Sequence, residues 1–286
     1  TAAGAPTVVI EARPETFAGT FQAMWRYRSF FGLLFRENLL RRARGTLLGF
    51  WWVILRPLMA AAGFIATFVF VAPLNTGTGV PYPVFFLSGF IPWRLFQATV
   101  TQLPRAVMRS RGMMSRTYFP RLLVPLAGFG QALIEVGLLC AVFVIVVATQ
   151  WWTHPGQAPI RLGIQTVWLL PCLLGALAFA VAIGMVFGIV ALFFRDVVFS
   201  LTYIVQLVMF VTPVLYPATF VPGSYRWLLY SLNPMAQMVT VSRWALTGQG
   251  AFEPFFVLLA FVTIAVVFAA AVVFFLRAER YLGDQL

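Results

Sequence analysis

The sequence predicts an all-α membrane protein with six transmembrane helices. Three observations support this fold class: 61% of the 286 residues are hydrophobic, only 10% are charged, and the apolar residues form runs long enough to cross a bilayer. The runs cover about 48–71, 83–103, 122–149, 164–194, 197–213 and 255–276. An even number of spans places both termini on the same side of the membrane.

The residues before the first span are expected to form a cytoplasmic tail at 1–24 and an interface helix at 25–45. In this helix Tyr27, Phe31, Leu34 and Phe35 recur at helical spacing, which is typical of an amphipathic helix lying on the membrane surface. Residues 46–286 then form a single transmembrane domain. The charged residues that we assign to the interface helix are Arg36, Glu37, Arg41 and Arg42.

The arginines indicate how the spans are oriented. With six spans, fifteen of the twenty basic residues lie on the side of the termini and three on the opposite side. Positive charge stays on the cytoplasmic side of a membrane protein, so both termini are predicted to be cytoplasmic. The formal net charge of +12 is explained by topology and anionic headgroups, and nucleic acid is not an expected partner.

The loop at 104–121 combines positive charge with large apolar side chains. Such side chains gain little in water unless another surface covers them. We predict a short helix near Val107–Ser115 that docks on a partner protein; the alternative is a helix resting on lipid headgroups. The residues assigned to docking are Arg109, Arg111, Met113, Met114 and Tyr118.

The segment at 213–250 is largely apolar but is interrupted by four prolines, so no single helix spans it. Two short helices at about 223–232 and 235–247 are predicted, with Asn233–Pro234 as the turn between them. We expect them to be re-entrant helices that dip into the outer leaflet and pack on protein. An ordinary surface loop with interfacial aromatic residues is the alternative.

Two ionisable residues fall within predicted spans. Arg94 and Glu135 lie at similar depth in neighbouring antiparallel spans, and two roles remain open for them. They form a structural ion pair, or they line the substrate path, where Arg94 would meet a pyrophosphate-linked lipid head. Cys140, Cys172 and His154 have no partner ligands nearby in the sequence, so no metal site and no catalytic site are predicted.

An ordered set of segments resembles a known family. These are TVVIEARP, WRYRSFFGLLFRENLLRRARGTLLGFWWVILRPLM, FFLSGFIPWRLF, TPVLYP and LNPMAQMVTVSRWALTG. Together they resemble the membrane-spanning subunit of ABC exporters of bacterial surface polysaccharides, such as O-antigen, teichoic acid and capsule. The resemblance implies a homodimer flanked by two copies of an ATP-binding subunit, with the 104–121 loop docked on that subunit. Relatives tend to carry Gln–Pro where this chain has Arg56–Pro57.

The resemblance implies a permease that moves lipid-linked polysaccharide across the bacterial inner membrane. No nucleotide-binding motif is present, so ATP and Mg²⁺ would belong to the partner subunit. The alternatives are a polytopic lipid-linked glycosyltransferase or polymerase, and an ion-driven flippase. The scarcity of acidic residues disfavours both. The candidate path residues are Trp93, Arg94, Glu135, Tyr216, Trp227 and Arg243.

Overall fold

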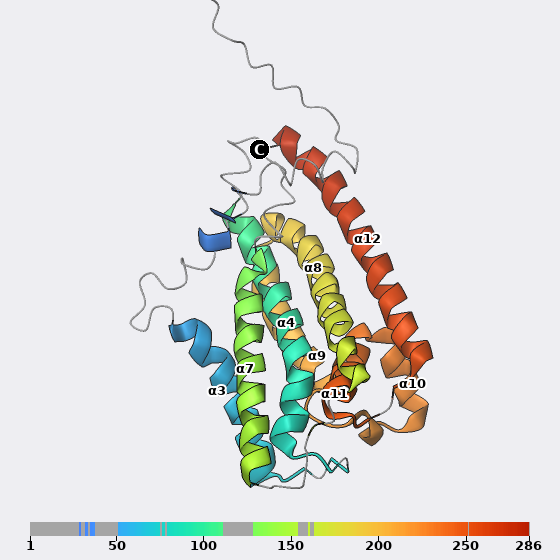
Figure 1. The fold of residues 1–286 in the computed structure, drawn as a ribbon. Helices are drawn as coiled ribbons and strands as arrows, with labels where there is room; N and C mark the ends of the chain where they lie inside the picture. Colours follow the sequence, from blue (N-terminus) through green and yellow to red (C-terminus); the bar gives the residue numbers. More distant parts are fainter. Residues whose placement is uncertain are drawn as a thin grey trace, which may run out of the picture.

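The computed structural model describes residues 29, 32, 33, 35–37, 51–74, 76, 77, 79–110, 128–153, 160, 163–250 and 252–285. All regular elements in these residues are helical (Figure 1). The long helices are α3 (Trp51–Ala66, continued by a π-helical turn over Thr67–Val71), α4 (Tyr82–Arg109), α7 (Gly130–Thr153), α8 (Leu169–Phe193) and α12 (Pro254–Gln285). The shorter ones are η2 (Ile164–Trp168), α9 (Asp196–Val211), η3 (Ala218–Phe220), α10 (Gly223–Leu232) and α11 (Pro234–Thr247).

Four helical segments are long and apolar enough to cross a bilayer: 54–71, 130–153, 164–193 and 254–278. The chain is therefore a multispan helical membrane protein, as the sequence predicts. α9 has 16 residues, and α4 has 28 residues but carries several polar side chains. The short helices α10 and α11 lie at the lower end of the bundle in Figure 1, and α4, α8 and α12 end at its upper end.

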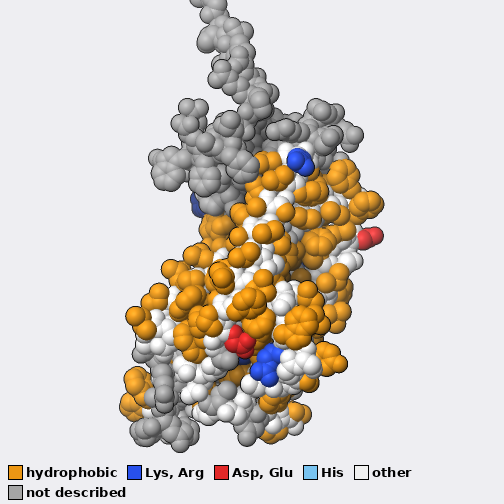
Figure 2. Space-filling view, turned by 90° about the vertical axis from the view of Figure 1, so that its right-hand side faces the viewer, with side chains coloured by type: hydrophobic (Ala, Val, Ile, Leu, Met, Phe, Trp, Pro, Cys, Tyr) orange, Lys and Arg blue, Asp and Glu red, His pale blue; other side chains and the backbone are white. Residues whose placement is uncertain are grey.

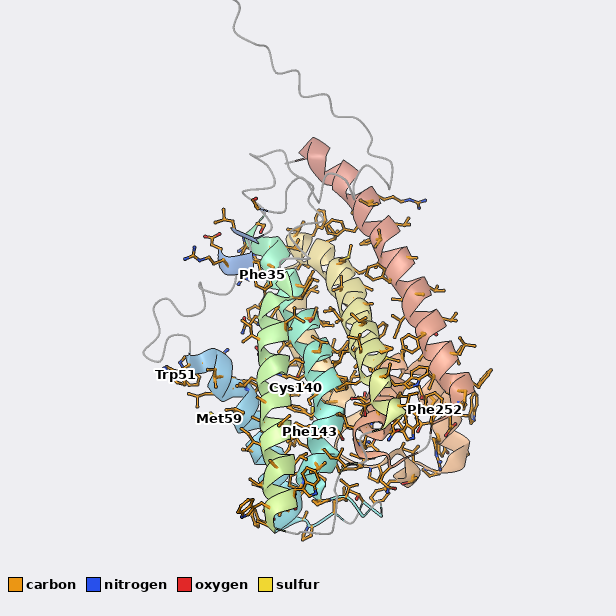
Figure 3. The ribbon with its side chains drawn as sticks, viewed as in Figure 1. Phe35, Trp51, Met59, Cys140, Phe143 and Phe252 are labelled. Carbon is orange, nitrogen blue, oxygen red and sulfur yellow. The ribbon has the colours of Figure 1, made fainter. Side chains whose placement is uncertain are left out.

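The outside of the bundle is strongly apolar. Hydrophobic side chains cover most of the face seen in Figure 2, and charged groups on it are few. Trp51 and Met59 of α3 point away from the other helices in Figure 3, and both side chains are more than 60% exposed. In water such a surface would aggregate, whereas in a bilayer it faces lipid or another membrane helix.

α4 occupies the centre of the bundle, and it packs closely against a row of small residues on α8. Ala176, Ala180, Gly184 and Gly188 recur every four residues on α8, and both alanines are fully buried. A methyl group added at Gly184 would lie 3.0 Å from the Leu103 side chain of α4. Small residues let the two backbones approach, which replaces the hydrophobic effect as the main source of helix association in lipid.

A proline inside α4 creates the link between α4 and α11. Pro92 lacks an N–H, so the carbonyl of Ser88 one turn earlier loses its helical donor. The hydroxyl of Ser242 on α11 donates to this carbonyl at 3.0 Å. A backbone acceptor that would otherwise be unsatisfied in an apolar interior is thus paired across two helices.

The helix boundaries follow the sequence prediction closely in the second half of the chain. The expected helices at 223–232 and 235–247 are α10 and α11, and Asn233 caps α11 by accepting from the backbone N–H of Met235 at 3.1 Å. The first half requires one correction. We expected a loop from residue 104 with a short helix near Val107–Ser115, but α4 continues through Pro104 to Arg109, because Val107 still packs against Gly188 of α8. The rest of the expected helix, 111–115, lies outside the described residues.

Only part of the expected interface helix lies within the described residues. Ser29, Gly32, Leu33 and residues 35–37 are helical, and the ring of Phe35 lies against Gly130 at the start of α7. Among the surface residues assigned from the sequence, Arg36 is exposed and Glu37 is half-buried, whereas Arg41 and Arg42 lie outside the described residues.

Candidate functional site

A single polar line runs along α4. Between Val84 and Val107 every residue of α4 is buried except four, and all four are polar. The four are Arg94, Gln97, Thr101 and Arg105. Their spacing of three, four and four residues places them on one face of the helix. α4 is therefore packed against protein on most sides and open only along a hydrophilic track.

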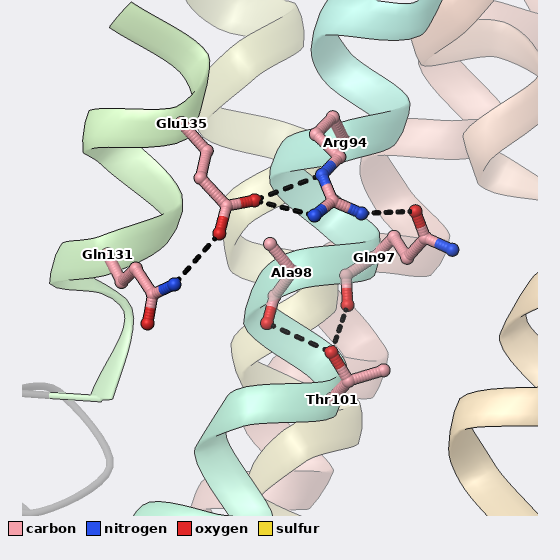
Figure 4. A network of polar contacts seen from close by, with 6 residues as sticks. All are labelled: Arg94, Gln97, Ala98, Thr101, Gln131 and Glu135. Atoms are coloured by element: carbon pink, nitrogen blue, oxygen red, sulfur yellow. Dashed lines mark hydrogen bonds and ion pairs between the residues drawn. The ribbon is translucent and has the colours of Figure 1, made fainter. Parts of the chain in front are cut away.

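The upper part of Figure 4 shows the charged centre of this track. Arg94 forms an ion pair with Glu135 of α7, with Nη2 2.8 Å and Nε 3.0 Å from the same carboxylate oxygen. The other carboxylate oxygen accepts from Gln131 at 3.0 Å, and Nη1 of Arg94 donates to Gln97 at 2.9 Å. The ion pair expected from the sequence is present. Hydrogen bonds from Gln131 and to Gln97 extend it on both sides.

The two partners differ in exposure. The side chain of Glu135 is 3% exposed and that of Arg94 is 19% exposed. The carboxylate is thus enclosed by protein, whereas the guanidinium reaches the open side of α4. A molecule moving along the track would meet Arg94 and Gln97 rather than Glu135. The substrate-path roles assigned to Arg94 and Glu135 remain predictions.

α9 continues the polar surface. Nη2 of Arg105 donates to the hydroxyl of Thr202 at 3.1 Å, which links the inner half of α4 to α9. One turn further along α9, Gln206 is exposed although it lies ten residues into an apolar helix. A primary amide facing hydrocarbon is unfavourable, so this face of α9 is expected to meet water or protein.

The segment that joins α9 to α10 is irregular, and side chains satisfy its backbone. Nη2 of Arg243 donates to the carbonyls of Pro213 and Val214, both at 3.0 Å. The hydroxyl of Tyr82 donates to the carbonyl of Leu215 at 3.1 Å. The hydroxyl of Tyr216 reaches back to the last turn of α9, at 3.0 and 3.1 Å. Non-helical backbone at membrane depth persists only when its polar groups are paired in this way.

Several residues assigned to the path from sequence have other surroundings. Trp93 is fully buried and packs on Phe96, so it does not line an open surface of this chain. Arg243 is 4% exposed and its Nε donates to the carbonyl of Phe85, so it fastens α11 to α4. Tyr216 is half-buried with its hydroxyl engaged. Trp227 is 57% exposed on α10.

The docking residues fall mostly beyond what the structure describes. Arg109 is exposed in the last turn of α4. The remaining members of the set lie outside the described residues, namely Arg111, Met113, Met114 and Tyr118. Their assignment to docking therefore stays a prediction.

Sequence reasoning did not recognise the polar line that continues from Arg94 towards the C-terminal end of α4. Gln97 and Thr101 were not singled out, and Arg105 was counted only among the positive charges of the 104–121 loop. Their spacing from Arg94 is visible in the sequence as polar residues at helical intervals in an apolar run. Ser242 was missed for a different reason, because its acceptor lies on a helix distant in sequence.

A bundle of apolar helices around a central helix with one polar face defines a multispan helical membrane protein. The chain belongs to the ABC-2 type transporter family, whose family model matches residues 29–247.

The chain is similar to several named permeases. It is 27% identical to the O-antigen export system permease protein RfbA of Myxococcus xanthus over 265 residues, covering 90% of this chain and 96% of that protein. It is 27% identical to RfbA of Klebsiella pneumoniae over 206 residues, which is 71% of this chain and 74% of that protein. It is also 24% identical to the polysialic acid transport protein KpsM of Escherichia coli over 212 residues, or 73% and 78% of the two chains.

Proposed function

We propose that this chain is the permease subunit of an ATP-driven exporter that moves lipid-linked polysaccharide, of the O-antigen kind, across the inner membrane. The observation that carries the proposal is the polar line on α4, because all four residues on the one open face of this central helix are polar. Membership of the ABC-2 family and the names of the relatives support the same assignment. ATP hydrolysis is assigned to a separate ATP-binding subunit.

The proposed topology has six spans with both termini in the cytoplasm. The four apolar helices supply four of them, α4 supplies one by virtue of its 28 residues, and α9 supplies the last. A helix of 16 residues is about 24 Å long, which is shorter than the hydrocarbon core. The carbonyl pairing after α9 supports the view that this span ends inside the membrane, with α10 and α11 as re-entrant helices.

A homodimer is the proposed assembly. The polar line of α4 and the exposed Gln206 of α9 lie on open faces of one chain, so a single copy leaves hydrophilic groups facing lipid. A second copy related by a two-fold axis would enclose them and form a closed path. α3 and α9 are the proposed seam, since both leave large apolar side chains uncovered. Two ATP-binding subunits would complete the complex.

The polar line suits a substrate that must slide. Gln97 and Thr101 offer amide and hydroxyl groups that exchange hydrogen bonds with sugar hydroxyls, and their separation of four residues spaces them by about 6 Å. Arg94 and Arg105 add positive charge at two depths. Several weak contacts at intervals allow a polymer to move without a deep free-energy minimum at any one position.

Cysteine accessibility tests this path directly. Cys140 and Cys172 are first replaced by alanine, and Gln97→Cys or Thr101→Cys is introduced into the transporter together with its ATP-binding subunit. A charged thiol reagent added to the cycling complex should modify both positions, because thiolates form in water but not in lipid. Val266→Cys on α12 is the matched control, since that side chain is exposed only to the bundle's exterior. Equal protection at all three positions would refute the path assigned to α4.

A further inference from the structure

A pocket opens near the ends of α10 and α11, on the side of the bundle that the proposed topology places outside. Its polar wall contains two arginines, Arg226 and Arg243, together with Tyr230. Its apolar wall contains Phe85 and Pro217. The other lining residues are Ala218, Thr219, Thr240, Thr247, Gln249 and Gly250.

Both guanidinium groups have unused hydrogen-bonding capacity. Arg243 lies over the Phe85 ring at 3.8 Å, and its Nε and Nη2 donate to backbone carbonyls. The described part of the chain provides no hydrogen-bond acceptor for its Nη1. Nε of Arg226 is buried and has no partner among the described residues. A buried donor without an acceptor is unfavourable, and such donors are rare in folded proteins.

No acidic residue is among the described residues that line the pocket. The carboxylate of Glu253, just before α12, interacts electrostatically with the Tyr230 hydroxyl. Within the described residues it forms an ion pair with neither arginine. Two cations therefore face one partly apolar space whose described lining contains no carboxylate. An anion placed there would satisfy both guanidinium groups, and phosphate matches their planar fork of donors.

The surroundings indicate where such an anion comes from. The outer side of α10 exposes Tyr225, Trp227, Leu228 and Leu232, which is the composition of a helix lying at the membrane interface. We propose that the pocket binds the phosphate of a membrane lipid in the outer leaflet. Two sources share this chemistry: the headgroup of a glycerophospholipid, and the diphosphate of the polymer's lipid anchor, the latter resting on the proposed function.

Native mass spectrometry of the delipidated protein in detergent tests the site. The probes are phosphatidylglycerol, a polyprenyl diphosphate, and diacylglycerol as a control that lacks phosphate. The two phosphate-bearing lipids should bind and diacylglycerol should not. Arg226→Gln should weaken their binding about ten- to hundred-fold, as expected for a lost hydrogen bond to a charged group. Tyr230→Phe, which keeps the ring packed on Phe256, should weaken it less.

Arg195→Gln is the matched control, because Arg195 is exposed in the turn between α8 and α9, at the opposite end of the bundle. Unchanged binding by Arg226→Gln, equal binding of diacylglycerol, or an equal loss in Arg195→Gln would overturn the proposal. Preference for one phosphate-bearing lipid would identify the source. The assay needs neither ATP hydrolysis nor export, so its failure leaves the proposed function untouched, and loss of export with normal lipid binding would not affect the pocket.

Discussion

Replacing Arg94 by glutamine should destabilise the protein more than replacing Glu135 by glutamine. In Arg94→Gln the carboxylate of Glu135, which is 3% exposed, keeps only its hydrogen bond from Gln131 and loses its counter-charge. Removing one partner of a buried ion pair costs about 3–5 kcal/mol. In Glu135→Gln the amide oxygen still accepts from the guanidinium, which is 19% exposed, so the cost should be about 1–3 kcal/mol.

The double variant Arg94→Gln/Glu135→Gln completes a thermodynamic cycle. It leaves no isolated charge, so its free energy of unfolding should fall by less than the sum of the two single changes, with a coupling of about 2 kcal/mol or more. Unfolding in a detergent titration of the purified protein measures all three values. Thr101→Val is the control, because the Thr101 hydroxyl donates only to backbone carbonyls of its own helix. Exchanging the two charges should recover part of the loss.

One result would refute this reasoning. If Arg94→Gln leaves the unfolding free energy and the yield unchanged while export stops, the ion pair does not hold α4 to α7. Arg94 would then act on the transported molecule, and the substrate role would replace the structural one.

Three further changes test neighbouring parts of the fold and the coupling of ATP hydrolysis to export. Gly89→Ala should lower stability by roughly 1–3 kcal/mol, because the added methyl would lie 2.5 Å from Nη2 of Arg243. An unchanged melting temperature would contradict the close packing of the Arg243 side chain on α4. Ser242→Ala should cost about 1–3 kcal/mol by leaving a buried carbonyl of α4 without its donor, with Ser242→Thr as the control. Replacing Met113 and Met114 by Asp should uncouple ATP hydrolysis from export, and normal co-purification and export would exclude this loop as the docking element.

The features that the sequence predicted well depend on local patterns. Apolar runs predicted the four helical segments that are long enough to cross a bilayer, because hydrocarbon imposes their length. Prolines together with Asn233 predicted where α10 and α11 begin, because they act within a few residues. The pairing of Arg94 with Glu135 was also predictable, since only two ionisable residues shared one depth. Each of these inferences uses only residues close in the sequence or spans that follow one another.

The features that the sequence did not reveal depend on distant partners. From sequence, Arg243 was assigned to the substrate path. In the structure its guanidinium donates to backbone carbonyls that lie 30 and 158 positions away in the sequence. Trp93 was assigned to the substrate path from sequence, yet its side chain is fully buried in the bundle. Prolines in the sequence indicate that some backbone carbonyls lack N–H donors. Only the fold shows which side chains donate to them.

The position of α4 suggests how events at the two membrane surfaces become linked. Its C-terminal end leads directly into the segment expected to contact the ATP-binding subunit, and its middle carries the polar line. Its N-terminal end holds the irregular segment and α11 through Tyr82, Phe85 and Ser88. Interlocking of α4 with the small residues of α8 resists bending, so the two helices should move as one body. A displacement at the inner surface would therefore shift the path and the outer segment together, with no separate signal required between them.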